Sequence, residues 1–272
     1  IAGVGDPPPV PKAEVGELFR VWSHCWQQVL LKPEEGVELP ATFLYAENVP
    51  AATILHFDDR HRHRLLHHHG LLARAIRFLE ESRPGLNLLT IDLRGWGDTT
   101  PALYPYEMAG WGGIDRYLSY TSAALGDSIM GMRFRDGLAS LSYLRTRPEV
   151  DSEKIVITGH GLGAVVALHV AAIDNNLGGV VVWDSPVSFK SLLEVEDYTW
   201  PADSFVPNVL LHYDLPELIE SCSSPIKVLN PLDGHGNSLS ATSLEAHNVK
   251  LNRRVFVADS DDQTILDCIE SI

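Results

Sequence analysis

The feature that most constrains the fold is a regular alternation of short apolar, β-branched runs with segments of helical periodicity. Such runs are typical of strands buried on both faces of a sheet. Strands are expected at 51–57, 87–92, 154–158, 178–184, 225–230 and 253–258. Helices are expected at 64–81, 127–147, 162–174, 214–221, 239–246 and 263–271. Because strands that alternate with helices run parallel, the pattern predicts an α/β protein, with helices on both faces of a mostly parallel sheet.

Two further strands precede this alternation and complete the expected sheet. Residues 20–32 and 37–47 have the pattern of an antiparallel hairpin around the turn at 33–36. With the six later strands they predict an eight-stranded sheet within one domain at 20–272, preceded by a Pro-rich leader at 1–19. The sequence starts at Ile1 rather than Met. We therefore expect a processed or truncated start, with a signal peptide or further domain upstream.

Charge and hydropathy exclude some classes of partner. The formal net charge of −15 argues against nucleic acid, because phosphate binding requires a basic surface. The sequence contains no apolar run of about 18 residues, the length that a membrane-spanning helix requires. Neither nucleic acid nor a membrane is therefore expected as a partner, and the acidic balance favours a solvated surface.

Three motifs resemble those of α/β-hydrolases, and more narrowly those of acetyl xylan esterases and related acyl hydrolases. They are "IDLRGWGDTTP" (91–101), "GMRFRDGLASLSYLRTRPEVDSEKIVITGHGLG" (131–163) and "HYDLPELIESCSSPIKVLNPLDGHG" (212–236). The resemblance covers about residues 20–272. It implies the α/β-hydrolase fold, a Ser-His-Asp triad at the carboxyl ends of the strands, and a carbohydrate ester as ligand.

The turn "GHGLG" departs from this family at the residue that matters most. In a serine hydrolase it is G-x-S-x-G, with the nucleophile at its centre. Gly159 and Gly163 supply the flanking glycines, which let strand and helix pack closely. The central residue is Gly161, which has no atom that can attack a carbonyl. Glycine also removes the backbone strain of that position, so the substitution favours the fold while it removes the chemistry.

The remaining parts of the triad are also altered or missing. The loop after the last expected strand, at 258–263, contains no histidine that could act as the general base. Asp233 follows its strand at the distance expected for the acidic residue. The turn that should stabilise the oxyanion, at 55–60, has no glycine and carries Asp58 and Asp59, whose charges would repel an oxyanion.

Other residues could replace the missing groups. His160 lies beside Gly161 but is expected to point away from the centre of the turn and to pack beneath it. His235 follows Asp233 by two residues and could act as a displaced base. Ser185 ends the strand before it and could supply a nucleophile, although Ser-Pro after a strand is more typical of a turn.

The histidine-rich segment 57–70 is the densest set of potential metal ligands. His63 and His67 are four residues apart, a spacing that can bind zinc on a helix. Interleaved arginines disfavour a cation there, so neither a metal nor a cofactor is expected. In "IDLRGWGD", Asp92 and Arg94 are expected to tie loops together.

An aromatic-rich insertion at 95–126 offers the best candidates for ligand binding. Trp96, Tyr106 and Trp111 could stack against a sugar, or could pack the insertion onto the domain. A second long insertion lies at 185–216. Both insertions follow strand ends, where open α/β sheets form ligand sites.

These observations leave two functions open. The first is a degenerate esterase-like domain that binds a carbohydrate or serves as an accessory module. The second is an active carbohydrate esterase or other acyl hydrolase with a rearranged constellation, in which Asp233 and His235 take part. A reactive nucleophile would distinguish the second from the first. A polysaccharide ligand would favour a secreted or periplasmic location.

Overall fold

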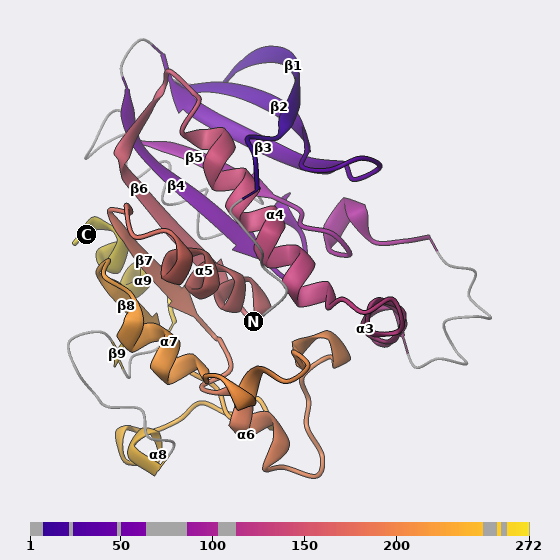
Figure 1. The fold of residues 1–272 in the computed structure, drawn as a ribbon. Helices are drawn as coiled ribbons and strands as arrows, with labels where there is room; N and C mark the ends of the chain where they lie inside the picture. The colour runs from indigo at the N-terminus through magenta and orange to yellow at the C-terminus, as the bar shows by residue number, and fades with distance from the viewer. Residues whose placement is uncertain are drawn as a thin grey trace.

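The computed structural model describes residues 8–21, 24–47, 50–63, 86–102, 113–246, 255–256 and 260–271. Within these ranges nine strands form one sheet in the order β1-β2-β3-β5-β4-β6-β7-β8-β9 (Figure 1). The strands are β1 Lys12–Val21, β2 His24–Lys32, β3 Leu39–Ala46, β4 Ala51–Asp58, β5 Asn87–Ile91, β6 Val150–His160, β7 Gly179–Trp183, β8 Ile226–Leu229 and β9 Val255–Phe256. The α/β class and all eight predicted strands are confirmed.

The sheet is antiparallel at one edge and parallel through the rest. β1, β2, β3 and β5 pair antiparallel, and the pairs from β5 through β4 and β6 to β9 are all parallel. The parallel strands therefore present their carboxyl ends along one edge. In the register of β4 with β6, Asp58 lies beside His160, although 102 residues separate them.

Helices cover both faces of the sheet. They are α3 Ile114–Ala124, α4 Ile129–Leu144, α5 Leu162–Ile173, α6 Phe189–Leu193, α7 Leu215–Ser221, α8 Ala241–Ala246 and α9 Asp262–Glu270. The larger buried cluster joins α4, α5 and α7 to one face of the sheet, and a smaller cluster joins α9 to the other. Figure 1 shows α4 and α5 side by side across the first face. The helix predicted at 64–81 lies outside the described residues.

Two parts of the fold differ from the sequence prediction. The predicted leader at 1–19 contains most of β1, so the sheet has nine strands rather than eight. β1 is an edge strand in which Val15, Leu18 and Phe19 remain exposed, Phe19 to 55%, and it has a bulge between Val15 and Leu18. Without a buried face, the strand carries no regular alternation in its sequence.

The two insertions contain helices that were not predicted, and they contact each other. Ser119 of α3 donates to the Ala202 carbonyl at 3.2 Å, and the Ala202 amide donates to Asp115 at 2.9 Å. Ala202 begins the 3₁₀ helix η3, Ala202–Ser204. These contacts join the first insertion to the second. No helix in the described part of the chain has the length and apolarity to cross a membrane.

Candidate functional site

The turn between β6 and α5 has the sharp geometry that its glycines predict. Gly161 adopts φ +58° and ψ −125°, a conformation that costs little only for glycine. A Cβ on Gly159 would lie 2.5 Å from the Gly163 carbonyl oxygen, and one on Gly163 would lie 2.3 Å from the Phe57 carbonyl oxygen. The flanking glycines are therefore required by close approach of strand, turn and helix.

The carboxylate of Asp59 fills the space beside the central glycine. A Cβ on Gly161 would lie only 2.2 Å from Oδ2 of Asp59. The same oxygen accepts a hydrogen bond of 2.9 Å from the Leu162 amide. In a G-x-S-x-G hydrolase, the amide after the nucleophile faces the developing oxyanion. Here an internal carboxylate both blocks the position of a nucleophile and occupies that amide.

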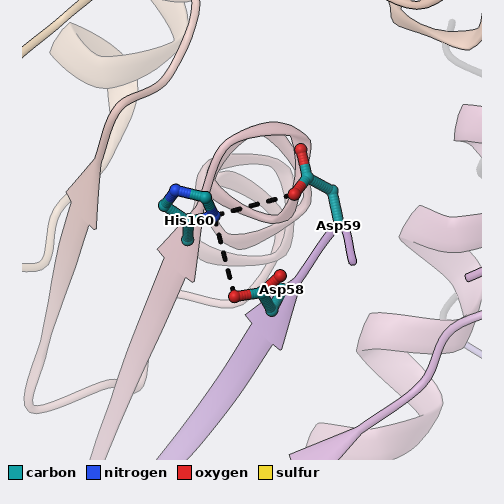
Figure 2. A group of neighbouring side chains, drawn as sticks. All are labelled: Asp58, Asp59 and His160. Atoms are coloured by element: carbon teal, nitrogen blue, oxygen red, sulfur yellow. Dashed lines mark ion pairs between the residues drawn. The ribbon is translucent and has the colours of Figure 1, made fainter. Parts of the chain in front are cut away.

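Three further charged groups meet at the same edge of the sheet. Nδ1 of His160 lies 3.6 Å from Oδ2 of Asp58 and 3.6 Å from Oδ1 of Asp59 (Figure 2). Nε2 of His160 lies 3.5 Å from Oδ2 of Asp184. The imidazole thus lies among three carboxylates, which come from the ends of β4 and β7 and from the loop after β4.

This arrangement determines the charge on the imidazole. Burial acts to lower the pKa of His160, but Asp184, Asp59 and Asp58 together outweigh it and raise the pKa to about 9. His160 is consequently an imidazolium at neutral pH. Burial would raise the pKa values of Asp59 and Asp184, but the imidazolium and hydrogen-bond donors reverse this and lower both pKa values.

The carboxylates are held in place by neighbouring donors. Oδ1 of Asp58 accepts from the Arg60 amide at 2.8 Å. Oδ1 of Asp184 accepts from Asn230 and from Ser260, each at 2.7 Å. Ser260 belongs to the loop that follows the last strand, where an α/β-hydrolase places its histidine. A neutral hydroxyl therefore contacts this edge in place of a base.

The structure does not join Asp233, His235 and Ser185 through their side chains. The Asp233 carboxylate accepts from the amides of His235 and Asn237 at 2.9 and 2.8 Å, an arrangement that closes the loop. Nδ1 of His235 lies 3.1 Å from the Asp197 carbonyl oxygen. Ser185 is buried, and its carbonyl accepts from the Leu232 amide at 2.8 Å. Their catalytic roles remain predictions.

Trp96 packs inside the fold, against Arg133 of α4. It is 5% exposed, and the guanidinium of the buried Arg133 lies 4.0 Å from its ring centroid. The ring is therefore packed within the fold, which is the second of the two alternatives that the sequence left open, and a stacking role for Trp96 stays a prediction. Tyr106 and Trp111 lie outside the described residues.

Asp92 and Arg94 have the structural role expected of them. Asp92 is fully buried, accepts from the Arg62 amide at 2.6 Å and forms an ion pair with its guanidinium. Arg94 donates to Asp136 through Nε at 2.8 Å. Within the histidine-rich segment, His61 lies 3.1 Å from Asp98. His67 lies outside the described residues, so its predicted pairing with His63 stays a prediction.

The second insertion forms an apolar pocket of about 340 Å³. Its lining comes from α6, from η3, from the 3₁₀ helix η4 (Val209–Leu211) and from the segment between η3 and η4. It includes Phe189, Leu192, Val206 and Val209. Leu193 and Leu211 lie at the pocket and are 64% and 78% exposed. The position of this insertion after a strand end predicted a ligand site, but its apolar lining was not predicted.

Comparison with known proteins agrees with this topology. A model of the alpha/beta hydrolase family matches residues 65–259. The chain belongs to the alpha/beta hydrolase family. Among curated proteins, no sequence matches this hydrolase chain.

Several solved structures share the hydrolase fold. A Bacteroides fragilis protein assigned as an acetyl xylan esterase superposes with a TM-score of 0.70 at 15% identity, over 82% of this chain and 64% of that one. An acetyl xylan esterase from a Paenibacillus species gives 0.67 at 16% identity, over 95% and 88%. Acetyl xylan esterase 1 from a Thermoanaerobacterium species gives 0.61 at 14%, over 95% and 88%. At these identities the similarity shows that the chain has an acetyl-esterase-like hydrolase fold.

The altered glycine was predicted from the sequence, but two residues at this edge of the sheet were not. Asp59 was recognised only as an unfavourable neighbour of an oxyanion, and Asp184 was not singled out for the site. Asp184 carried a signal, because it directly follows a parallel strand, where side chains gather at the ligand edge. The position of Asp59 follows from the adjacency of β4 and β6, which no local motif records.

Proposed function

We propose that this chain is a degenerate member of its family, with an acetyl-esterase-like fold that binds a carbohydrate or serves as an accessory module. It does not run the serine-hydrolase reaction. The single observation that carries this proposal is the position of Asp59, whose carboxylate lies where a nucleophile would project and accepts from Leu162. A negative charge there opposes formation of an oxyanion.

The state of the nearby histidines supports the same proposal. A general base must be neutral before it accepts a proton, and His160, with a pKa of about 9, is already protonated at neutral pH. His56 is neutral, because burial first and the charge of His160 second hold its pKa well below the ordinary value. It is fully buried and hydrogen-bonds Thr158 at 2.7 Å, so it has no access to a ligand.

The proposed ligand is a carbohydrate, because the structures with the same fold that are named above are acetyl xylan esterases by name. The insertions at the carboxyl ends of the strands would provide the binding surface. An accessory module would use the same surface to deliver a neighbouring catalytic domain to its polysaccharide.

The test combines turnover with binding. Purified protein is assayed with p-nitrophenyl acetate and acetylated xylan, and is treated with a fluorophosphonate probe that labels activated serines. Binding of xylan oligosaccharides is measured by calorimetry. We expect no turnover above buffer and no labelling, together with saturable binding of the oligosaccharides.

Two variants test the alternative function, an active hydrolase with a relocated triad. Turnover that survives repurification and is lost in His235→Ala or Ser185→Ala would show a relocated triad and overturn the proposal. Absence of both turnover and oligosaccharide binding would overturn the carbohydrate assignment. An active acetyl xylan esterase assayed in parallel serves as the positive control for the substrates and the probe.

A further inference from the structure

We propose that the apolar pocket of the second insertion is a binding site for one uncharged alkyl or acyl chain of roughly ten to twelve carbon atoms. The pocket has a volume of about 340 Å³. An apolar cavity of about 150 Å³ holds one benzene molecule, so this pocket has room for roughly twice as many carbon atoms. Asp59, His160 and Asp184 do not line it, so it is separate from the charged edge of the sheet. The inference does not depend on carbohydrate binding.

The walls of the pocket are apolar and buried. Phe189 and Leu192 come from α6, and Val206 and Val209 come from the segment after η3 and from the start of η4. The ring of Phe189 also lies 6.2 Å from the ring of His169 in α5, so this wall packs against the core of the domain. Apolar cavities do not hold ordered water and bind apolar molecules instead. The walls therefore favour an apolar ligand.

Polar groups around the pocket already have partners within the protein. The Phe189 amide donates to Asp214 at 2.6 Å, and the Ser204 hydroxyl donates to the Pro201 carbonyl. Asp214 is also the N-cap of α7, so the same carboxylate holds α6 to α7. A sugar that entered the pocket would lose hydrogen bonds to water and gain few in return, which is costly. We therefore expect the pocket to exclude sugars.

The segment 205–211, "FVPNVLL", is more apolar than a surface connection requires. It contains one phenylalanine, two valines and two leucines beside Pro207 and Asn208. Asn208 has φ +62°, a left-handed conformation in which asparagine is common, and it turns the segment. Surface connections are usually polar, with special residues only where the backbone turns. The turn thus accounts for Asn208, and the pocket accounts for the apolar residues.

Exposed leucines lie at the mouth of the pocket. Phe189, Leu192 and Leu193 occupy one face of α6 because they are spaced by three and four residues. The first two are buried, but Leu193 is 64% exposed, and Leu211 of η4 is 78% exposed. Both leucines line the pocket. Exposed apolar side chains beside a concave apolar space are typical of a binding site, and a bound chain would cover them.

Charges near the mouth favour a ligand without charge. Lys190 and Glu194 of α6 form an ion pair at 3.2 Å, so the nearby cation already has a carboxylate partner. The net charge of −15 disfavours the approach of an anion. An ester or alcohol is therefore preferred to a fatty-acid anion, with its polar end in water at the mouth. A protein partner would need a broader contact, about 800 Å² on each side, than a pocket of this size offers.

The experiment is a fluorescence titration with N-phenylnaphthylamine, an uncharged probe whose emission rises in an apolar site. Decanol, decanoate and xylan oligosaccharides are then added as competitors at neutral pH. We expect saturable binding of one probe per chain, displacement by decanol, weaker displacement by decanoate and none by the oligosaccharides.

Variants at the pocket and a matched control locate the binding site. Leu211→Asp places a charge at the mouth and should weaken probe binding about 10-fold or more. Val206→Trp fills the cavity and should abolish binding. Leu125 is also 78% exposed but does not line the pocket, so Leu125→Asp should leave binding unchanged. Circular dichroism establishes that each variant is folded, and if Val206→Trp does not fold, Leu211→Asp decides because it replaces an exposed side chain.

Several results would overturn the proposal. One is the absence of saturable binding, and another is equal binding by the wild type and Leu211→Asp. Displacement by xylan oligosaccharides would contradict an apolar ligand, and displacement by decanoate as strong as by decanol would contradict an uncharged one. A wild-type dimer that dissociates in Leu211→Asp, without probe binding in either protein, would assign the leucines to a protein contact instead.

Discussion

At Gly161 the residue that best suits the fold is one that cannot act as a nucleophile. Its positive φ of +58° makes any side chain costly, and Asp59 occupies the space that a Cβ would need. We expect Gly161→Ala to destabilise the protein by about 3 kcal/mol or more, the sum of backbone strain and displacement of a buried carboxylate. Gly161→Ser should add no esterase activity. Urea unfolding and the p-nitrophenyl acetate assay check these outcomes.

Gly126 provides the matched control for this prediction. It also has a positive φ, of +80°, but a Cβ there would meet nothing within 4 Å. Gly126→Ala should therefore show the cost of strain alone, about 1 kcal/mol. Equal losses at the two positions would mean that Asp59 does not obstruct Gly161. Partial recovery of Gly161→Ala by a second change, Asp59→Ala, would attribute the difference to that carboxylate.

His169 leads to a prediction on pH. It is buried in α5, with Nε2 2.8 Å from the Tyr213 hydroxyl and its ring stacked on Phe134. Burial lowers the pKa of His169 from 6.5 to about 4. Between these values the unfolded chain binds a proton that the folded protein excludes, so the free energy of unfolding falls as the pH drops from 6.5 to 4. The loss should reach about 3 kcal/mol.

Comparison with His169→Gln isolates this contribution from the titration of carboxylates. Urea unfolding at pH 7.5 and pH 4.5 should show a smaller loss of stability on acidification in the variant than in the wild type. The variant is expected to be less stable at pH 7.5 because it loses the aromatic stack. An identical pH dependence in both proteins would show that His169 titrates normally in the fold.

The residues that the sequence revealed were those whose role depends on local geometry. Gly159, Gly161 and Gly163 mark a tight turn whatever surrounds them, so the missing nucleophile was visible directly. The sequence left the roles of Trp96 and His235 open, because the burial and orientation of a side chain depend on distant partners. Trp96 is covered by Arg133 of α4, and Asp59 meets Leu162 across 103 residues.

At the scale of elements, one buried ion pair joins α4 to the second insertion. Arg133 is fully buried and donates to Asp203 in η3 at 2.5 Å. We expect Asp203→Ala to cost about 3–5 kcal/mol, because it leaves the guanidinium buried without a counter-charge. Glu194→Ala, which breaks an exposed pair with Lys190, should change stability little. Chemical denaturation measures both, and similar costs would contradict the burial argument.

The elements themselves show which patterns can be predicted. β4, β7 and the carboxyl-terminal half of β6 are buried on both faces, and α5 begins at a glycine turn. Apolar runs and helix breakers therefore located these elements within a few residues. β1 was missed because an exposed edge strand needs no apolar face. α3 and the 3₁₀ helices were missed because their stability comes from contacts between the two insertions, which a local pattern does not contain.

At the scale of the whole molecule, the sheet brings distant segments into one layer. The larger buried cluster extends from Cys25 in β2 to Leu244 in α8, and the smaller one includes Cys268 in α9. The site depends on the same sheet: Asp58, His160 and Asp184 lie close together only when β4, β6 and β7 are paired in register. Stability and site geometry should therefore be lost together.

The three cysteines can show whether the protein unfolds in a single transition, because they lie in separate parts of the fold. Cys25, Cys222 and Cys268 are buried thiols with exposed fractions of 1%, 2% and 9%, and burial raises the pKa values of Cys25 and Cys268. A buried thiol reacts with an aromatic disulfide reagent only after the surrounding structure opens. In increasing urea, we expect all three to become reactive in one transition that coincides with loss of circular dichroism. Mass spectrometry of the labelled peptides identifies each site. Reaction of Cys268 well before Cys25 would show that α9 and its edge of the sheet open as a separate unit, and would contradict unfolding as a single domain.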